Sequence, residues 1–173
     1  EDSCELQLRQ PHLVPFETRR PDKDGKGEVT FRDLLHSALR LRPDRIILGE
    51  IRGGEALDLL QAMNTGHSGS MSTIHANNAY DSLLRLETCV MYAGFDLPLS
   101  AIRNQVVAAL NYIVHTGRLE DGSRKVLGIS KVLPLEHGEY HLESEWEWTQ
   151  TGTDESGKFI GKFNKVQKEQ QGS

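Results

Sequence analysis

The sequence predicts an α/β protein that has parallel strands with helical crossovers and, after them, an antiparallel β region. Short β-branched and aliphatic runs alternate with longer segments of helical periodicity over residues 1–110. Alternation of this kind is typical of parallel sheets, because a parallel pair needs a long connection. Over residues 111–163 apolar residues instead alternate with polar ones, which indicates antiparallel strands. Residues 164–173 are polar, and we expect them to form a disordered tail.

The first helix is predicted over residues 30–41, where leucine and alanine repeat at helical spacing. Thr30 and Asp33 form a capping box at its start, and Pro43 ends it. The same criteria, with glycine or proline at the ends, predict the remaining elements of this part: strands over 45–50 and 70–76, and helices over 53–66, 79–93 and 97–110.

The antiparallel region is predicted to begin with two strands in residues 111–135. These strands flank Asp121 and Gly122, the residue pair favoured in a type I′ hairpin turn. Apolar side chains alternate again over 139–152 (EYHLESEWEWTQTG) and over 159–166 (FIGKFNKV), which predicts two further strands.

The length and composition are those of a single globular domain. The chain has 173 residues, of which 37% are hydrophobic and 26% are charged. Its formal net charge of −5 disfavours a surface built for nucleic acid. No apolar stretch approaches the roughly 18 residues that a membrane span needs. Cys4 and Cys89 lie far apart, and we expect them to be reduced thiols rather than part of a zinc site.

Glu50 follows directly on a predicted buried strand, in the stretch RIILGEIRGG (45–54), although a carboxylate is rarely buried without a partner. Ligands of parallel α/β sheets bind outside the carboxyl ends of the strands. A carboxylate at that place can contact Mg²⁺ through water or orient an attacking water. The second strand brings His75 to a comparable end, and the turn before it carries His67. We therefore expect one acid and two imidazoles on one rim.

Two other interpretations of these residues stay open. Glu50 can be a solvated glutamate paired with Arg52, with both histidines held by local hydrogen bonds. Alternatively, Glu50, His67 and His75 can be the groups of a zinc hydrolase, although their spacing matches no H-E-x-x-H helix.

Residues 42–77 (RPDRIILGEIRGGEALDLLQAMNTGHSGSMSTIHAN) resemble the secretion ATPases of type II and type IV secretion machines. The nearest resemblance is to the branch that powers tight-adherence (Flp) pilus assembly, called CpaF or TadA. In that family RIILGE is the Walker B strand, which ends in the catalytic glutamate, and GHSGSMSTIHAN is the His box. The resemblance thus implies catalytic roles for Glu50, His67 and His75.

The resemblance extends from residue 1 to about residue 163 and weakens after residue 134. The opening EDSCELQL resembles the Asp box of the family, which implies that Glu1 and Asp2 lie near the nucleotide and its metal. Arg19 is by the same resemblance a candidate phosphate contact. Arg52 is a candidate to brace the catalytic glutamate or to contact the nucleotide.

The implied fold is the C-terminal part of a RecA-like P-loop NTPase domain over residues 1–110, with an antiparallel β extension over 111–163. ATP and Mg²⁺ are the implied cofactors, and Glu50 and Asp2 would hold the metal through water. The implied partners are identical subunits in a hexamer and an inner-membrane platform protein. The ring would be cytoplasmic and peripheral at the inner membrane, and no nucleic-acid partner is expected.

The phosphate-binding loop of the family, G-x-x-x-x-G-K-[ST], is expected upstream of the Asp box. A near-match occurs at 152–159 (GTDESGKF), but Phe159 replaces the Mg²⁺-binding hydroxyl. Asp154 and Glu155 would also place negative charge where phosphate binds. We therefore expect a loop between two strands at this position.

The sequence accordingly predicts a fragment that holds half of an ATP site and does not hydrolyse ATP by itself. The alternative is a non-catalytic assembly module that docks on a ring or a platform protein. A RecA-type DNA enzyme is disfavoured by the acidic charge and by the His box.

Overall fold

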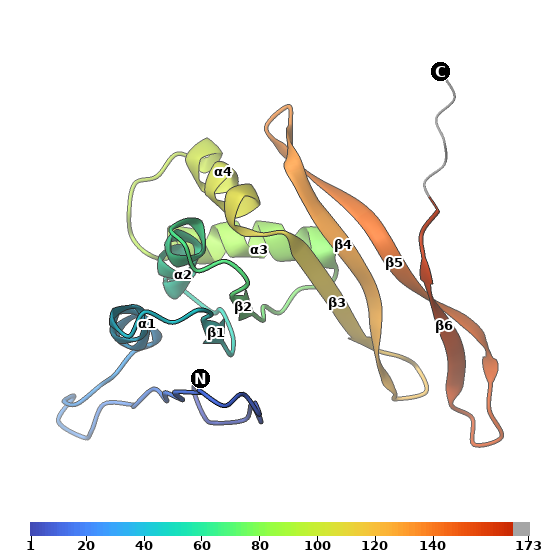
Figure 1. Ribbon diagram of the computed structural model, residues 1–173, viewed down its shortest axis with the longest axis horizontal. Coiled ribbons are helices and arrows are strands. Elements are labelled where there is room, and N and C mark those ends of the chain that lie inside the picture. Colours follow the sequence, from blue (N-terminus) through green and yellow to red (C-terminus); the bar gives the residue numbers. More distant parts are fainter. Residues whose placement is uncertain (168–173) are drawn as a thin grey trace.

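The computed structural model describes residues 1–167 and consists of a helical body and a long antiparallel sheet (Figure 1). The segment before α1 is extended and runs past α1 and β1. The helical body contains the helices α1 (Phe31–Arg40), α2 (Glu55–Asn64), α3 (Ala79–Met91) and α4 (Leu99–Ala109) and the short strands β1 (Ile47–Leu48) and β2 (Met71–Ser72). The sheet contains β3 (Tyr112–Arg118), β4 (Arg124–Glu136), β5 (Glu139–Thr153) and β6 (Phe159–Lys165).

The strands β1 and β2 form a parallel pair with α2 as the crossover, as the alternation in the sequence predicted. Ile47 pairs with Met71 at the start of the register. Both strands are shorter than the predicted 45–50 and 70–76, because within residues 1–167 no third strand pairs with either of them. One further backbone hydrogen bond beyond each end extends the contact between the two segments.

Helix α2 lies at the centre of the helical body, where it packs against α1, α3 and α4. Its Leu59 and Leu60 are almost completely buried, together with Leu83 of α3 and with Ile102 and Val106 of α4. Burying each of these side chains contributes about 1.5–3 kcal/mol. This core fixes the crossover helix and, through it, the two strand ends that it connects. Within residues 1–167 none of the helices is long and apolar enough to cross a bilayer.

Side-chain caps define the starts of α1 and α3. The Thr30 side chain accepts a hydrogen bond from the Asp33 amide, and the Asp33 carboxylate accepts one from the Thr30 amide. The predicted capping box is thereby confirmed. Asn78 caps α3 by accepting a hydrogen bond from the Asp81 amide. Helix α3 therefore begins only a few residues after His75.

The sheet has the strand order β3-β4-β5-β6 and is antiparallel throughout, as predicted. The turn between β3 and β4 is not the predicted type I′ turn. Gly122 alone has a positive φ there (80°), and its N–H donates to the carbonyl of Leu119. A type I turn followed by a left-handed glycine fits this geometry. In this conformation the Asp121 carboxylate accepts hydrogen bonds from the amides of Ser123 and Phe159, which ties the turn to the start of β6.

Strand β6 continues through Lys165, two residues beyond the expected end of the β extension at residue 163. The expectation of a disordered tail over residues 164–173 lies, for residues 168–173, outside the residues that the structure describes.

Arg103 of α4 joins the helical body to the sheet, at the turn between β4 and β5. Arg103 of α4 donates through Nε to Glu87 of α3 at 2.8 Å. Through Nη1 it donates to the carbonyl of Gly138 and to the Glu139 carboxylate, both at 2.7 Å. Its guanidinium also lies 5.6 Å from the ring centre of the buried Tyr140. In Figure 1 this turn lies beside α4, whereas β6 is the strand farthest from the helices.

Candidate functional site

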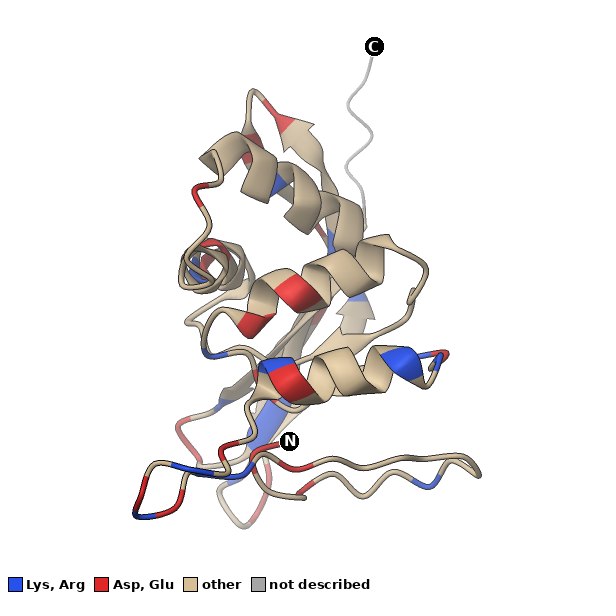
Figure 2. Cartoon of the chain, turned by 90° about the vertical axis from the view of Figure 1, so that its left-hand side faces the viewer, with Lys and Arg blue, Asp and Glu red and all other residues tan. Residues whose placement is uncertain are grey.

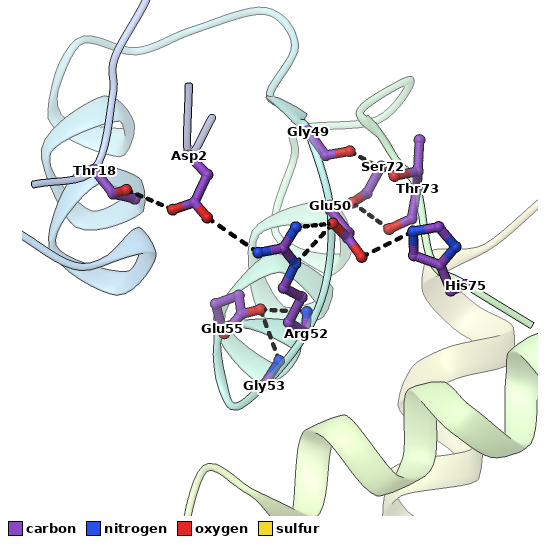
Figure 3. A network of polar contacts seen from close by, with 10 residues as sticks. All are labelled: Asp2, Thr18, Gly49, Glu50, Arg52, Gly53, Glu55, Ser72, Thr73 and His75. Carbon is purple, nitrogen blue, oxygen red and sulfur yellow. Dashed lines mark hydrogen bonds and ion pairs between the residues drawn. The ribbon is translucent and has the colours of Figure 1, made fainter. Parts of the chain in front are cut away.

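Glu50 lies at the carboxyl end of β1 and is held on both sides of its carboxylate (Figure 3). Its Oε2 accepts hydrogen bonds from Arg52, at 2.7 Å from Nε and 2.6 Å from Nη2. Its Oε1 lies 3.2 Å from Nε2 of His75, which follows β2. The side chain of Glu50 is 21% exposed, so it is neither free in solvent nor sealed in the core. The two parallel strand ends therefore bring Glu50 and His75 together, as predicted.

Arg52 connects Glu50 to the N-terminal segment. Its Nη1 donates to Oδ2 of Asp2 at 3.0 Å, while the hydroxyl of Thr18 donates to Oδ1 of Asp2 at 2.6 Å. The hydrogen bond from Arg52 holds the pKa of Glu50 below its usual value, against the opposite effect of burial. The Thr18 hydroxyl, and then the charge of Arg52, lower the pKa of Asp2. Both carboxylates are consequently ionised at neutral pH, and one guanidinium serves both.

The loop that carries Arg52 is held rigidly by backbone contacts. The Ile51 amide donates to the carbonyl of Thr73 at 2.8 Å, and the Thr73 hydroxyl donates to the carbonyl of Gly49. The amides of Arg52 and Gly53 both donate to the carboxylate of Glu55, at 2.7 and 2.8 Å. The start of α2 thereby fixes the backbone of the loop, and the Arg52 side chain is aimed at Glu50 (Figure 3).

Glu1 lies beside β1, but its carboxylate is turned to its own segment. The carboxylate accepts hydrogen bonds from the amides of Glu5 and Leu6, both at 3.1 Å. The backbone of Glu1 accepts from the Thr18 amide at 3.0 Å. Its side chain approaches Gly49 so closely that a Cβ at that position would lie 3.1 Å from Cγ of Glu1. Asp2 therefore joins the Glu50 cluster, and Glu1 supports the segment that positions it.

Arg19 does not join this cluster. Its Nε donates to the carbonyl of Gly27, and its backbone pairs with Val29 across the loop that closes there. Side chains of both charges follow this N-terminal segment (Figure 2). Arg19 and Asp2 nevertheless line the same cleft, of about 420 Å³, between the N-terminal segment, the start of α2 and the end of α3.

His67 lies at the opposite end of the parallel pair. It precedes β2, whereas Glu50 follows β1, and parallel strands point their carboxyl ends the same way. Its Nδ1 lies 3.1 Å from the carbonyl of Ala62, and its own carbonyl accepts from the Ser70 hydroxyl at 2.7 Å. The expectation that both histidines share a rim with Glu50 is therefore wrong for His67, because a short turn before a strand reaches the amino end.

The near-match to a phosphate loop is the connection between β5 and β6, as predicted. The Asp154 carboxylate accepts hydrogen bonds from the amides of Ser156 and Lys158, at 2.8 and 2.9 Å, which fills the place of an anion. Nζ of Lys158 donates to the carbonyl of Asp121 at 2.6 Å. The amides of Ser156 and Lys158 and the Nζ of Lys158 thus already have partners within the protein.

A divalent ion would find two carboxylates on this rim, from Glu50 and Asp2. Among residues 1–167 no group of three or more His, Cys, Asp or Glu side chains is arranged to hold a metal ion. Mg²⁺ usually keeps several waters and binds one or two carboxylates together with substrate phosphates. The pair of ionised carboxylates therefore fits Mg²⁺ that arrives bound to a nucleotide.

Comparison with known proteins shows the family of the chain. The family described as "Type II/IV secretion system protein" matches residues 1–146. The chain belongs to this family. A putative conjugal transfer protein of Mycobacterium tuberculosis is 42% identical over 146 residues, which are 84% of this chain and 41% of that protein. The type IV secretion system protein VirB11 of Bartonella henselae is 38% identical over 133 residues, 75% of this chain and 36% of that protein.

A solved structure of the secretion family supports the fold. The VirB11 ATPase from the Brucella suis type IV secretion system, in complex with sulphate, matches with a TM-score of 0.56 and 34% identity. The match covers 60% of this chain and 32% of that chain. The RecA-like fold class is thus confirmed. The chain spans about 41% of the first curated relatives. The narrower tight-adherence branch stays a prediction.

Sequence reasoning missed two members of the site. The sequence gives no signal for Thr18, because its hydroxyl donates to Asp2, which lies sixteen residues away. For Glu55 the helical periodicity predicts only a place in the helix over residues 53–66. Its position in the first turn of α2, three residues after Arg52, is typical of an acidic residue that is favourable at a helix N-terminus, and here it accepts from the amides of Arg52 and Gly53.

Proposed function

We propose that residues 1–173 form the Walker B and His-box side of a motor ATPase that couples ATP hydrolysis to protein export. The observation that supports this proposal is the rim itself: ionised Glu50 at a strand end, flanked by His75 and by the Arg52–Asp2 pair. Phosphoryl transfer depends mostly on positioning and on charge neutralisation, which side chains from several strand ends can supply together.

Glu50 is the group that would orient and deprotonate the attacking water. Its Oε2 is committed to Arg52, so Oε1, on the side of His75, is the oxygen that faces the reaction. Arg52 keeps Glu50 ionised and therefore able to accept a proton. Mg²⁺, held by Glu50 and Asp2 through water, would neutralise charge on the phosphates of ATP.

The remaining residues of the site have supporting roles in this proposal. His75 positions Oε1 of Glu50, the oxygen that Arg52 does not contact, and would border the place of the terminal phosphate. Arg19 lines the cleft beside Asp2, from which it would contact a phosphate of its own or a neighbouring subunit. His67, at the other strand end, would respond to the conformation of the turn that carries it rather than to the phosphate. Glu1 would hold the Asp box against β1.

The working assembly in this proposal is a hexameric ring bound to an inner-membrane platform protein, at the cytoplasmic face. The names of the relatives support a secretion machine, since they include type IV secretion system proteins and conjugal transfer proteins. Within that class we infer the tight-adherence pilus branch from the resemblance of residues 42–77. Nucleic acid is not an expected partner, given the net charge of −5.

A non-catalytic docking module is the second candidate. It is favoured by one observation: the near-match to a phosphate loop in residues 152–159 is closed by its own carboxylate. Residues 1–173 alone should accordingly release no phosphate from ATP above background. The two candidates differ in what Glu50 does once the chain is part of the complete protein.

The test is Glu50→Gln in the complete protein that carries this chain. We expect nucleotide binding to persist and turnover to fall about 10²-fold or more, as the loss of a positioned base commonly causes. Glu155→Gln, in the exposed loop between β5 and β6, is the matched control and should leave turnover unchanged. Phosphate release and binding of a fluorescent nucleotide are the measurements. Turnover within about twofold of wild type would show that Glu50 is structural.

A further inference from the structure

A cleft of about 500 Å³ lies beside His75, between the segment that follows β2 and the exposed side of α3. Its lining residues include both polar and charged side chains: His75, Ala76, Asn77, Asp81, Leu84 and Arg85. In Figure 3, His75 lies on the side of Glu50 away from Arg52. The cleft is thus bordered by the histidine that contacts Oε1 of Glu50, whereas Arg52 contacts Oε2.

Arg85 brings an uncommitted positive charge to this cleft. Within residues 1–167 its guanidinium makes no hydrogen bond and no ion pair, whereas Arg52 serves two carboxylates. Asp81 lies one helical turn earlier, at a spacing that allows an ion pair with Arg85. Its carboxylate instead accepts a hydrogen bond from Asn78 at 2.9 Å. All five N–H donors of Arg85 are thus available to a ligand.

Arg85 is connected to Glu50 through the cleft that it shares with His75. Both residues line this cleft, and Nε2 of His75 lies 3.2 Å from Oε1 of Glu50. Arg85 therefore lies on the side of the site where His75 meets Glu50.

We propose that Arg85 binds the terminal phosphate of the nucleotide in the cleft beside His75. This inference rests on the proposed function, because it assigns a further phosphate-binding residue to the same site. Negative charge on the transferred phosphoryl group must be neutralised. The guanidinium of Arg52 already forms ion pairs with the carboxylates of Glu50 and Asp2, so its positive charge is neutralised within the protein. A guanidinium also offers paired donors that match the oxygens of a phosphate.

The test uses the 173-residue chain and inorganic phosphate as the probe. The Nε–Hε resonance of Arg85 and the ring resonances of His75 are followed by NMR during a phosphate titration at a constant ionic strength of about 0.1 M. We expect both to shift with one saturation curve. Arg85→Gln should weaken phosphate binding about tenfold or more, the usual effect of losing a charge-assisted hydrogen bond.

Arg40→Gln is the matched control. Arg40 is exposed in the last turn of α1, a helix that contributes no residue to the cleft, so this variant removes one positive charge from outside it. It should bind phosphate within about twofold of wild type, because exposed charges are screened beyond about 10 Å. Equal loss in both variants, or shifts at Arg19 and Arg20 with Arg85 unmoved, would overturn the proposal.

The outcome separates this inference from the proposed function. Phosphate binding that depends on Arg85, in a complete protein that does not hydrolyse ATP, would support the anion site and reject the motor. Turnover that depends on Glu50, with phosphate binding indifferent to Arg85, would support the motor and reject the role of Arg85. Because Arg85 is exposed, we expect the Arg85→Gln variant to fold. If the variant does not fold, the shifts of the wild-type Arg85 and His75 resonances during the phosphate titration test the proposal.

Discussion

Removing the charge of Arg103 should destabilise the chain strongly, because its partner stays buried. The side chains of Arg103 and Glu87 are 14% and 8% exposed, and their ion pair is 2.8 Å long. Arg103→Met keeps an apolar stem of similar length but leaves the Glu87 carboxylate without its cation. Breaking a buried pair in this way costs about 3–5 kcal/mol. At about 2–4 °C per kcal/mol for a chain of this size, Tm should fall by about 6–20 °C.

Two further variants distinguish how much of the lost stability comes from the exposed partner Glu139 and how much from the unpaired buried charge of Glu87. Glu139→Gln removes the outer partner, whose side chain is 61% exposed, and should cost less than about 1 kcal/mol. Arg103→Met combined with Glu87→Leu removes both buried charges. This double variant should lie within about 2 kcal/mol of wild type, since no unpaired buried charge remains and the losses are the hydrogen bonds of Arg103 to the β4–β5 turn and its contact with the Tyr140 ring.

Urea unfolding of the 173-residue chain, followed by far-UV circular dichroism and by the fluorescence of Trp146 and Trp148, measures these free energies. Both tryptophans lie in β5, the strand that begins at the Arg103 contact, so the two signals report on body and sheet. A loss below about 1 kcal/mol for Arg103→Met would refute the reasoning. A double variant as unstable as the single one would also refute it, because packing rather than the stranded charge would then be responsible.

Two further predictions concern the histidines and the turn at Asp121. In the complete protein, His75→Ala should slow single-turnover hydrolysis, because His75 contacts Glu50. His67→Ala should leave the rate of that step within about twofold of wild type, because His67 lies at the other strand end. Equal losses of rate in rapid-quench measurements would reject this division of roles. Hydrogen bonds, the largest from the Phe159 amide, lower the pKa of Asp121 from 3.8 to about 2. Its stabilising effect is therefore complete above about pH 4 and lost as the pH falls towards 2, so Asp121→Asn should flatten the pH dependence of the urea midpoint in that range. An unchanged dependence would show that Asp121 makes no contribution.

The helices and the place of Glu50 follow from signals within a few residues. The Thr30–Asp33 box closes over three residues, and the periodicity around Leu59 selects one face of a single helix. A strand that ends in a carboxylate indicates a ligand site for a similar reason, because the end of a parallel strand is also where the sheet opens. Local signals thus predicted the helices and the place of Glu50 at a strand end, and the alternation of strands and helices predicted that this end lies beside the one that carries His75.

Tertiary structure alone decided which distant groups meet. Asp2 and Arg52 are fifty residues apart and bond only because the N-terminal segment folds back along β1. The carboxylate of Asp121 accepts a hydrogen bond from Phe159 of a different hairpin, a contact that only the pairing of the strands brings about. His67 lies within the predicted motif, yet the direction of β2 places it at the far end. The physical reason is common to all three: a side chain's partners depend on chain direction and on contacts between segments, and neither is encoded in the spacing of neighbouring residues.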